Sequence, residues 1–269
     1  MVMKEYAYAK INLQLNILGK RPDGYHELDM IMQTVGLRDV LQVETVKTPG
    51  IVLESNYPEL DTPNNLICRA ARILAGEAHI IPHLHIKLVK NIFVAAGLAG
   101  GSADAAATFR VLNRLWKLNY SVTKLEELAG RLGSDIPFLI AGGTSRCQGR
   151  GEILTELPRT PARRVVLAKP RQVEVSTAWA YGAYDRLRSA VRQQHQDNDL
   201  ELVTVPAYPV IEELKRSAYR AGASLAMMSG SGPSVFALAN TEAEQQQILK
   251  AWSAFDADVV ATKYVGRMI

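Results

Sequence analysis

Apolar and polar residues alternate along the first stretch of the chain, from residue 6 to residue 17. One face of this stretch carries alanine, isoleucine and leucine, whereas Lys10 and Asn12 lie among the polar residues of the other face. A period of two is typical of a strand that buries one face, so we predict such a strand here. The Arg-Pro-Asp-Gly sequence at 21–24 then predicts a turn. Apolar runs at 30–37 and 40–43 predict further antiparallel strands.

The middle of the chain combines helices, a strand and a loop of small residues. Apolar residues recur every three or four positions between 66 and 74, which predicts a helix. Residues 83–90 alternate again and predict a strand. Helical spacing returns between 109 and 116, so the small residues of 94–106 form a loop that joins a strand to a helix.

The pattern changes after the proline-bearing stretch 158–161, and we place a domain boundary there. The predicted domains are residues 1–155 and 156–269. The second domain is predicted to contain, in order, a strand at 165–168, helices at 177–192 and 208–221, two short strands flanking 229–234, a helix at 242–253 and a strand at 259–265. This order is close to a ferredoxin-like βαββαβ unit, and the predicted fold class is α+β.

Composition narrows the class of protein without identifying it. In a chain of 269 residues, 48% hydrophobic and 22% charged residues are typical of a globular protein with a full core. No window approaches the roughly 18 apolar residues of a membrane span, and the first residues contain no apolar signal segment, so we expect a soluble cytoplasmic protein. The two cysteines, Cys68 and Cys147, form no CxxC pattern, and we expect both to be reduced thiols.

The loop at 94–106 is the strongest candidate for ligand binding. Gly97, Gly100 and Gly101 free the backbone to bend, so that its amide groups can approach phosphate oxygens, and the helix that follows adds the positive end of its dipole. The loop contains neither GxGxxG nor a Walker sequence. A tight strand-to-helix turn without a ligand explains the same glycines, and the loop alone leaves both interpretations open.

Three segments taken together resemble the GHMP kinases. They are the first strand with Lys10 and Asn12, the loop at 94–106, and the glycine-rich sequence MSGSGPSVFAL at 228–238. Further segments, at 9–28, 64–71 and 132–144, resemble the family member that phosphorylates the 2-hydroxyl of a cytidine-diphosphate-linked methylerythritol in the non-mevalonate route to isoprenoid precursors. The resemblance implies a two-domain fold with a ribosomal-protein-like α/β N-terminal domain and a ferredoxin-like C-terminal domain.

The resemblance also implies a catalytic pair. In such kinases Lys10 and Asp135 would meet at the transferred phosphoryl group, where Asp135 accepts the proton of the attacking hydroxyl and Lys10 neutralises charge. From spacing alone the simpler interpretations are a solvated lysine on a polar strand face and an N-terminal helix cap at Asp135.

The substrate contacts implied by the resemblance lie in two segments. Tyr25 and Tyr181 would sandwich a cytosine ring, and His26 would hydrogen-bond its edge. Asn12 resembles a further substrate contact. Without the resemblance, these tyrosines are ordinary amphipathic packing residues.

The nucleotide side is implied to use ATP and Mg²⁺, because the metal offsets phosphate charge. Asn65, Lys90 and Asp104 match positions around adenosine. The residues that match the phosphate loop are Val94, Ala95, Ala96, Gly97, Leu98, Ala99, Gly100, Gly101 and Ser102. The chain departs from the family pattern at Phe93, where proline is usual, at Ala99, where glycine is frequent, and at Ala103, where serine is frequent, so we assign no side-chain role to Ala103.

Other functions stay open from the sequence. Another GHMP enzyme would act on homoserine, mevalonate or a sugar, or decarboxylate a related substrate, and would not need Tyr25, His26 and Tyr181. A ligand-binding regulator on the same fold would not need both Lys10 and Asp135. The net charge of +4 suits an RNA-binding protein, but its basic residues are scattered, so we expect no nucleic-acid partner and no membrane partner. His79, His83 and His85 do not complete a metal ligand set, and we assign no protein-held metal.

Overall fold

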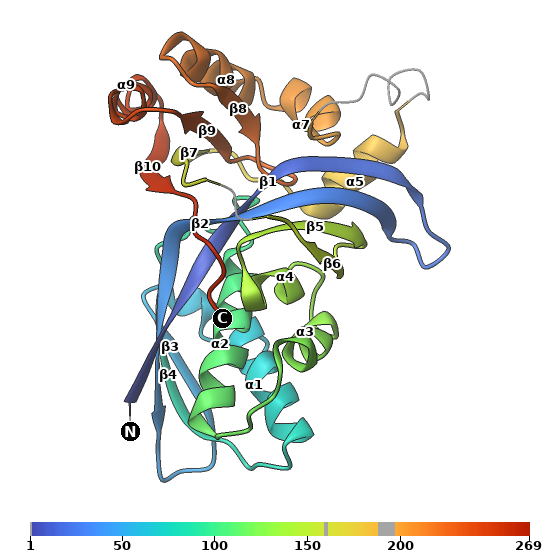
Figure 1. Ribbon diagram of the computed structural model, residues 1–269, viewed down its shortest axis with the longest axis vertical. Helices are drawn as coiled ribbons and strands as arrows, with labels where there is room; N and C mark the ends of the chain where they lie inside the picture. The colour runs from blue at the N-terminus through green and yellow to red at the C-terminus, as the bar shows by residue number, and fades with distance from the viewer. Residues whose placement is uncertain (1, 159–160, 188–196) are drawn as a thin grey trace.

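The computed structural model describes residues 2–158, 161–187 and 197–269. It contains a six-stranded sheet in the first half of the chain and a four-stranded sheet in the second half. In Figure 1, α1 and α2 lie against the first sheet, whereas α8 and α9 lie against the second. The long strands β1 and β2 extend from the first sheet to the second and pass beside α5.

The first sheet is built on one long antiparallel pair. Its strands are β1 (Val2–Lys20), β2 (His26–Thr45), β3 (Gly50–Ser55), β4 (His83–Val89), β5 (Thr144–Gly149) and β6 (Ile153–Glu156). Their order is β3-β4-β2-β5-β6, and β1 pairs with β2 outside this path. The strand predicted at 6–17 is confirmed as part of β1, and the turn predicted at 21–24 joins β1 to β2.

The prediction of two separate strands at 30–37 and 40–43 is wrong, because both runs lie within β2. Arg38 and Asp39 interrupt the apolar run, but they keep their pairing with Tyr8 and Ala7 of β1. Asp39 is completely buried and is held by hydrogen bonds, so its charge does not end the strand.

The helices of the first half pack on this sheet or on one another. They are the 3-10 helix η1 (Pro58–Leu60) and the α-helices α1 (Leu66–Glu77), α2 (Gly100–Leu115), α3 (Val122–Gly130) and α4 (Ile136–Ala141). The buried Arg110 of α2 donates to the carbonyls of Leu139 (2.7 Å) and Tyr6 (2.7 Å). One guanidinium therefore ties α2 to both α4 and β1.

The second half has the strand order β10-β7-β9-β8. Its elements are β7 (Arg164–Pro170), α5 (Thr177–Asp185), α7 (Glu201–Ala207), α8 (Val210–Arg220), β8 (Leu225–Met228), β9 (Val235–Ala239), α9 (Glu242–Trp252) and β10 (Ala257–Lys263). The predicted βαββαβ order is confirmed, although α7 was not predicted. The helix predicted at 177–192 ends earlier, at Asp185, and residues 188–196 lie outside the described residues.

The α+β fold class is confirmed, whereas the boundary between 155 and 156 stays a prediction. The first sheet ends at Glu156 and the second begins at Arg164. No helix within the described ranges is both long enough and apolar enough to cross a membrane.

Residues 197–199 connect the two halves. Asn198 forms a parallel bridge with Leu15 of β1, and its side chain donates to the carbonyls of Met228 (2.9 Å) and Gly230 (2.8 Å). The neighbouring Asp199 carboxylate accepts the amide hydrogen of Ile17 at 2.8 Å. The strand that carries Lys10 and the glycine-rich segment 229–234 are thereby held against the same short stretch of chain.

Candidate active site

A cavity of about 1050 Å³ lies where β1, the loop before α2, α5 and the glycine-rich segment meet. Of the residues predicted from the sequence, those on its wall are Lys10, Asn12, Tyr25, His26, Asn65, Lys90, Val94, Ala95, Ala96, Gly97, Ala99, Gly100, Gly101, Ser102, Asp104, Asp135 and Tyr181. Leu98 is the exception, since it is completely buried in the core. Ligand sites commonly measure about 300–1000 Å³, so this cavity lies at the upper end of their range.

Lys10 lies buried at the centre of this cavity, and the interpretation of a solvated lysine is wrong. Only 4% of its surface is exposed. Its ammonium donates to Asn12 Oδ1 (2.6 Å) and to the Gly97 carbonyl (3.1 Å), and it lies 3.9 Å from Asp135 Oδ2. Burial lowers the pKa of Lys10 below its ordinary value, against the opposing charge of Asp135.

Asp135 stands at the N-terminus of α4, but its side chain makes no capping hydrogen bond. The carboxylate, about one third exposed, therefore does not serve the helix, as a cap would. Its negative charge also acts on the wall of the cavity. Burial and the negative charge of Asp135 both raise the pKa of Tyr181. Burial and Asp135 also raise the pKa of the Cys147 thiol, to about 12. The structure thus brings together an amine and an acid that are far apart in sequence.

The loop before α2 touches the glycine-rich segment directly. Gly97 has a φ of +72°, and a Cβ there would lie 2.2 Å from the Ser229 carbonyl oxygen. The Ser229 hydroxyl donates to the Gly97 carbonyl at 3.0 Å, and the Ser234 amide donates to the Ala96 carbonyl at 3.3 Å. The close approach of two backbones, and not only a ligand, therefore requires glycine at 97.

Ala99 occupies a conformation that favours glycine. It is the residue before α2 and has a φ of 55° in the left-handed region. In this conformation a residue with a Cβ atom is about 1–2 kcal/mol less stable than glycine. This cost is a physical reason why related kinases frequently have glycine at the position of Ala99. Ala103 is buried and does not line the cavity, whereas Phe93 does.

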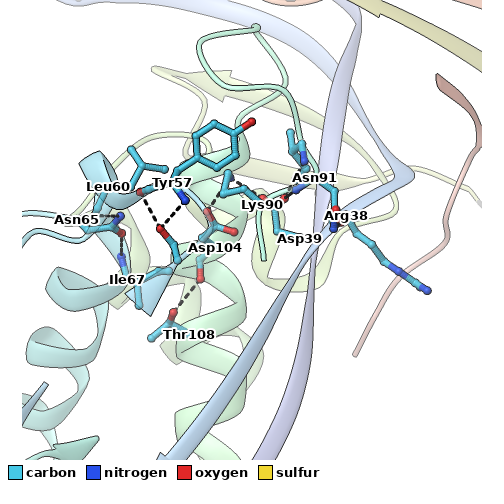
Figure 2. Close-up of polar contacts among 12 residues, drawn as sticks. Arg38, Asp39, Tyr57, Leu60, Asn65, Ile67, Lys90, Asn91, Asp104 and Thr108 are labelled. Atoms are coloured by element: carbon cyan, nitrogen blue, oxygen red, sulfur yellow. Dashed lines mark hydrogen bonds and ion pairs between the residues drawn. The ribbon is translucent and has the colours of Figure 1, made fainter. Parts of the chain in front are cut away.

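A buried charged group underlies the loop, as Figure 2 shows. The Lys90 ammonium donates to Asp39 (2.5 Å) and to Asp104 (2.8 Å), and all three side chains are almost fully buried. One ammonium cannot fully compensate two buried carboxylates. The pKa of Asp104 is raised to about 8, mainly by burial. The positive charge of Lys90 lowers this pKa and the negative charge of Asp39 raises it further. Asp104 Oδ1 has no hydrogen-bond partner among the described residues.

Asp39 is a residue that the sequence reasoning missed. Its Oδ1 accepts the amide hydrogen of Asn91 at 2.5 Å (Figure 2). It also accepts the amide hydrogen of Ile92 at 2.7 Å, and the two bonds fix the chain where it enters the loop. The available signal was a lone acid between the apolar runs of β2.

Asn65 was expected near adenosine, and it lines the cavity. Its side chain accepts from the Ile67 amide at 2.9 Å and donates to the Leu60 carbonyl at 2.9 Å (Figure 2). It is thus the N-cap of α1 and also joins that helix to η1.

The opposite end of the cavity is aromatic. The ring of His26 stacks on Tyr181, with centroids 4.7 Å apart and planes at 25°. Tyr25 is 54% exposed, and the Arg150 guanidinium lies 4.9 Å from the centre of its ring. His26 Nε2 lies 2.7 Å from Asp185 Oδ1, a contact that the sequence reasoning also missed. Tyr181 and Asp185 are four residues apart on α5 and therefore share a face, which was the available signal.

Oxygen donors for a divalent cation are few. No group of three or more histidine, cysteine, aspartate or glutamate side chains that could hold a metal occurs within the ranges that the structure describes. Asp135 and Ser102 supply oxygen atoms on the cavity wall. This donor set fits Mg²⁺ held mostly by nucleotide phosphates, the usual arrangement in kinases. His85 is instead paired with Glu54, at 3.2 Å.

Comparisons with known proteins agree over the whole chain. The family model "GHMP kinases N terminal domain" matches residues 65–143, and "GHMP kinases C terminal" matches residues 177–258. A Macrococcus caseolyticus protein named 4-diphosphocytidyl-2-C-methyl-D-erythritol kinase is 42% identical, over 97% of this chain and 99% of that protein. A protein of the same name from Bacillus pumilus is 41% identical, over 99% of this chain and 98% of that protein.

Solved structures show the same similarity. The crystal structure of 4-(cytidine 5'-diphospho)-2C-methyl-D-erythritol kinase superposes with a TM-score of 0.84 at 30% identity, covering 98% of this chain and 100% of that chain. A mevalonate kinase structure superposes with a TM-score of 0.75 at 13% identity, covering 98% and 99% of the two chains, and so shares the fold.

Proposed function

Because the chain belongs to the 4-diphosphocytidyl-2-C-methyl-D-erythritol kinases of the GHMP kinase family, we propose that it phosphorylates the 2-hydroxyl of 4-diphosphocytidyl-2-C-methyl-D-erythritol. ATP is the phosphoryl donor, as in GHMP kinases generally. The observation that carries the proposal is the distance of 3.9 Å between Lys10 Nζ and Asp135 Oδ2, on the wall of a large cavity that the loop at 94–102 also lines.

The reaction assigns a separate task to each member of this pair. The substrate hydroxyl attacks the terminal phosphorus of ATP, a new P–O bond forms, the bond to ADP breaks, and the hydroxyl proton passes to the Asp135 carboxylate. The Lys10 ammonium offsets charge on the transferred group. Its bonds to Asn12 and the Gly97 carbonyl hold it in place before substrate arrives, so that little reorganisation is required.

The phosphates would lie along the residues 94–102 and the first turn of α2. Backbone amides and the positive end of this helix suit an anion. Mg²⁺, when bound, would reduce the phosphate charge, and Ser102 and Asp135 are among the oxygen donors that the wall offers. Lys90 is committed to two carboxylates beneath the loop, so its role is to support the nucleotide site rather than to pair with phosphate.

The aromatic end would hold the cytidine diphosphate part of the substrate. A base that hydrogen-bonds the edge of His26 within the plane of that ring would lie roughly parallel to Tyr181, on which His26 is stacked. Tyr25, which is 54% exposed, would cover the other face of the base. The proposed role in the non-mevalonate route to isoprenoid precursors follows from this substrate, and the cytoplasmic location stays a prediction.

The test compares acceptors and then removes the acid. ADP release is measured with 4-diphosphocytidyl-2-C-methyl-D-erythritol, homoserine, mevalonate and galactose in parallel, and only the first is expected to support turnover. Asp135→Asn should lower kcat by roughly a hundredfold or more, the usual scale for a positioned base, while the affinities for ATP and acceptor stay unchanged. Asp256→Asn, at an exposed site outside the cavity, is the matched control. Unchanged turnover in Asp135→Asn would exclude this acid from the reaction.

A further inference from the structure

The Asp185 carboxylate is shared between two basic side chains at the aromatic end of the cavity. Its Oδ1 lies 2.7 Å from His26 Nε2, and its Oδ2 accepts from the Lys20 ammonium at 2.7 Å. Lys20 and His26 are register partners on β1 and β2, so both face the end of α5. His26 is about 10% exposed, which shields the contact from water.

The state of this carboxylate determines where His26 carries its proton. Burial favours protonation of Asp185, but the hydrogen bonds and charges of His26 and Lys20 lower its pKa below the ordinary value. An ionised carboxylate can only accept, so the hydrogen between the two side chains belongs to Nε2. In a neutral imidazole, Nδ1 then carries a lone pair.

The other ring nitrogen is available to a ligand. Within the described part of the chain, His26 Nδ1 has no hydrogen-bond partner, and the His26 ring lies on the cavity wall. Cytosine and uracil differ at positions 3 and 4 of one edge. At position 4 cytosine has an amino group that donates and uracil has a carbonyl oxygen that accepts, and at position 3 the two roles are reversed. A lone pair on Nδ1 that faces position 4 attracts the amino group of cytosine and repels the carbonyl oxygen of uracil.

We propose that Asp185 is a positioning residue that fixes the His26 proton on Nε2 and so makes the site select a cytosine base over a uracil base. This inference rests on the proposed function, because it assigns the His26 edge to the base of that substrate. Asp185 lines the cavity beside His26. It acts through the imidazole, in the way that a carboxylate orients a histidine in other active sites.

Asp185→Asn tests the inference, because Lys20 determines how the new amide is turned. The ammonium can only donate, so it holds the amide oxygen, and the amide NH₂ then faces His26. Nε2 must accept from this group, and the proton moves to Nδ1. In the double variant Lys20→Met, Asp185→Asn the ammonium no longer holds the amide oxygen, which can then accept from His26 Nε2.

Equilibrium binding of CDP and UDP is measured for the wild type and both variants. The wild type should bind CDP more tightly, and Asp185→Asn should reduce the CDP-to-UDP preference by roughly 10- to 100-fold, the scale of one mismatched buried hydrogen bond. The double variant should restore most of it. The kcat of Asp185→Asn with the cytidine substrate should stay within about threefold, since the effect is on KM. ¹⁵N NMR of the imidazole should show the proton on Nε2 in the wild type and on Nδ1 in Asp185→Asn.

Two outcomes would overturn the inference. One is an equal loss of CDP and UDP binding in Asp185→Asn, which indicates a merely structural role. The other is a wild-type His26 that is protonated on Nδ1 or on both nitrogens. Wild-type protein that selects CDP but phosphorylates no cytidine substrate would instead refute the proposed reaction and leave this inference supported.

Discussion

Replacing Asp104 by asparagine tests the charge state of the buried group beneath the phosphate loop. In the structure, Lys90 contacts both Asp104 and Asp39, and Asp104 has the raised pKa of about 8. Asparagine keeps an acceptor for Lys90 and leaves one ammonium opposite one carboxylate. The variant should therefore gain stability relative to the wild type as pH rises.

The sign and size follow from proton linkage. Between the ordinary pKa of 3.8 and the folded pKa of about 8, the native state binds the Asp104 proton more tightly than the unfolded state does. The wild type therefore loses stability as pH rises through this window, by about 1.4 kcal/mol per pH unit. From pH 5 to pH 8, the free energy of unfolding of Asp104→Asn should rise relative to wild type by about 4 kcal/mol.

Urea unfolding, followed by tryptophan fluorescence at pH 5, 6.5 and 8, measures this difference. Asp39→Asn is the control, since it leaves Asp104 as the only carboxylate on Lys90 and so lowers the pKa of Asp104. That variant should show a weaker pH trend, since burial still raises the pKa of Asp104. It should also be less stable throughout, because the single oxygen of asparagine cannot accept both from the two backbone amides and from Lys90. A constant difference between wild type and Asp104→Asn at all three pH values would refute the reasoning.

Two further predictions concern the glycine loop and the lysine. Gly97→Ala should lower the free energy of unfolding by at least about 2 kcal/mol and weaken ATP binding, because of its positive φ and its contact with the Ser229 carbonyl. Gly76→Ala, in a helix with open space around it, should instead stabilise the protein by about 0.4–1 kcal/mol in the same urea titration, and equal effects would contradict the contact. In a pH profile, kcat/KM should fall as pH rises through the pKa of Lys10, because only the ammonium form is active. This fall should occur below the ordinary lysine pKa of 10.5, since burial disfavours the ammonium. Asp135→Asn should move this fall to still lower pH, and a shift upward would contradict the pairing.

Local pattern predicted the elements well, because alternation and helical spacing report directly on burial. The strand at 6–17, the helix around 66–74 and the short strands flanking 229–234 all occur. The division of β2 into two strands failed because a buried, hydrogen-bonded Asp39 looks like a turn residue in sequence. Periodicity treats a charged residue as exposed unless its partners are known.

The site was less accessible to sequence reasoning than the fold. Spacing placed Lys10 on a polar face, and that face turned out to line a cavity, so the residue is polar and buried at once. Only the resemblance to a family joined it to Asp135. Asp39 and Asp185 were missed because their partners lie far away in sequence, at Lys90 and His26. The roles of the predicted site residues stay proposals that the variants above address.

The stretch 197–199 limits how this enzyme can change shape. Asn198 holds the carbonyls of Met228 and Gly230, and Asp199 holds the Ile17 amide, so β1 and the glycine-rich segment are anchored to one short rigid connection. Separating them would break several buried hydrogen bonds at once. We therefore expect the phosphate end of the cavity to be already formed before ligands arrive, and any adjustment to substrate to occur at the aromatic end, where Tyr25 is exposed.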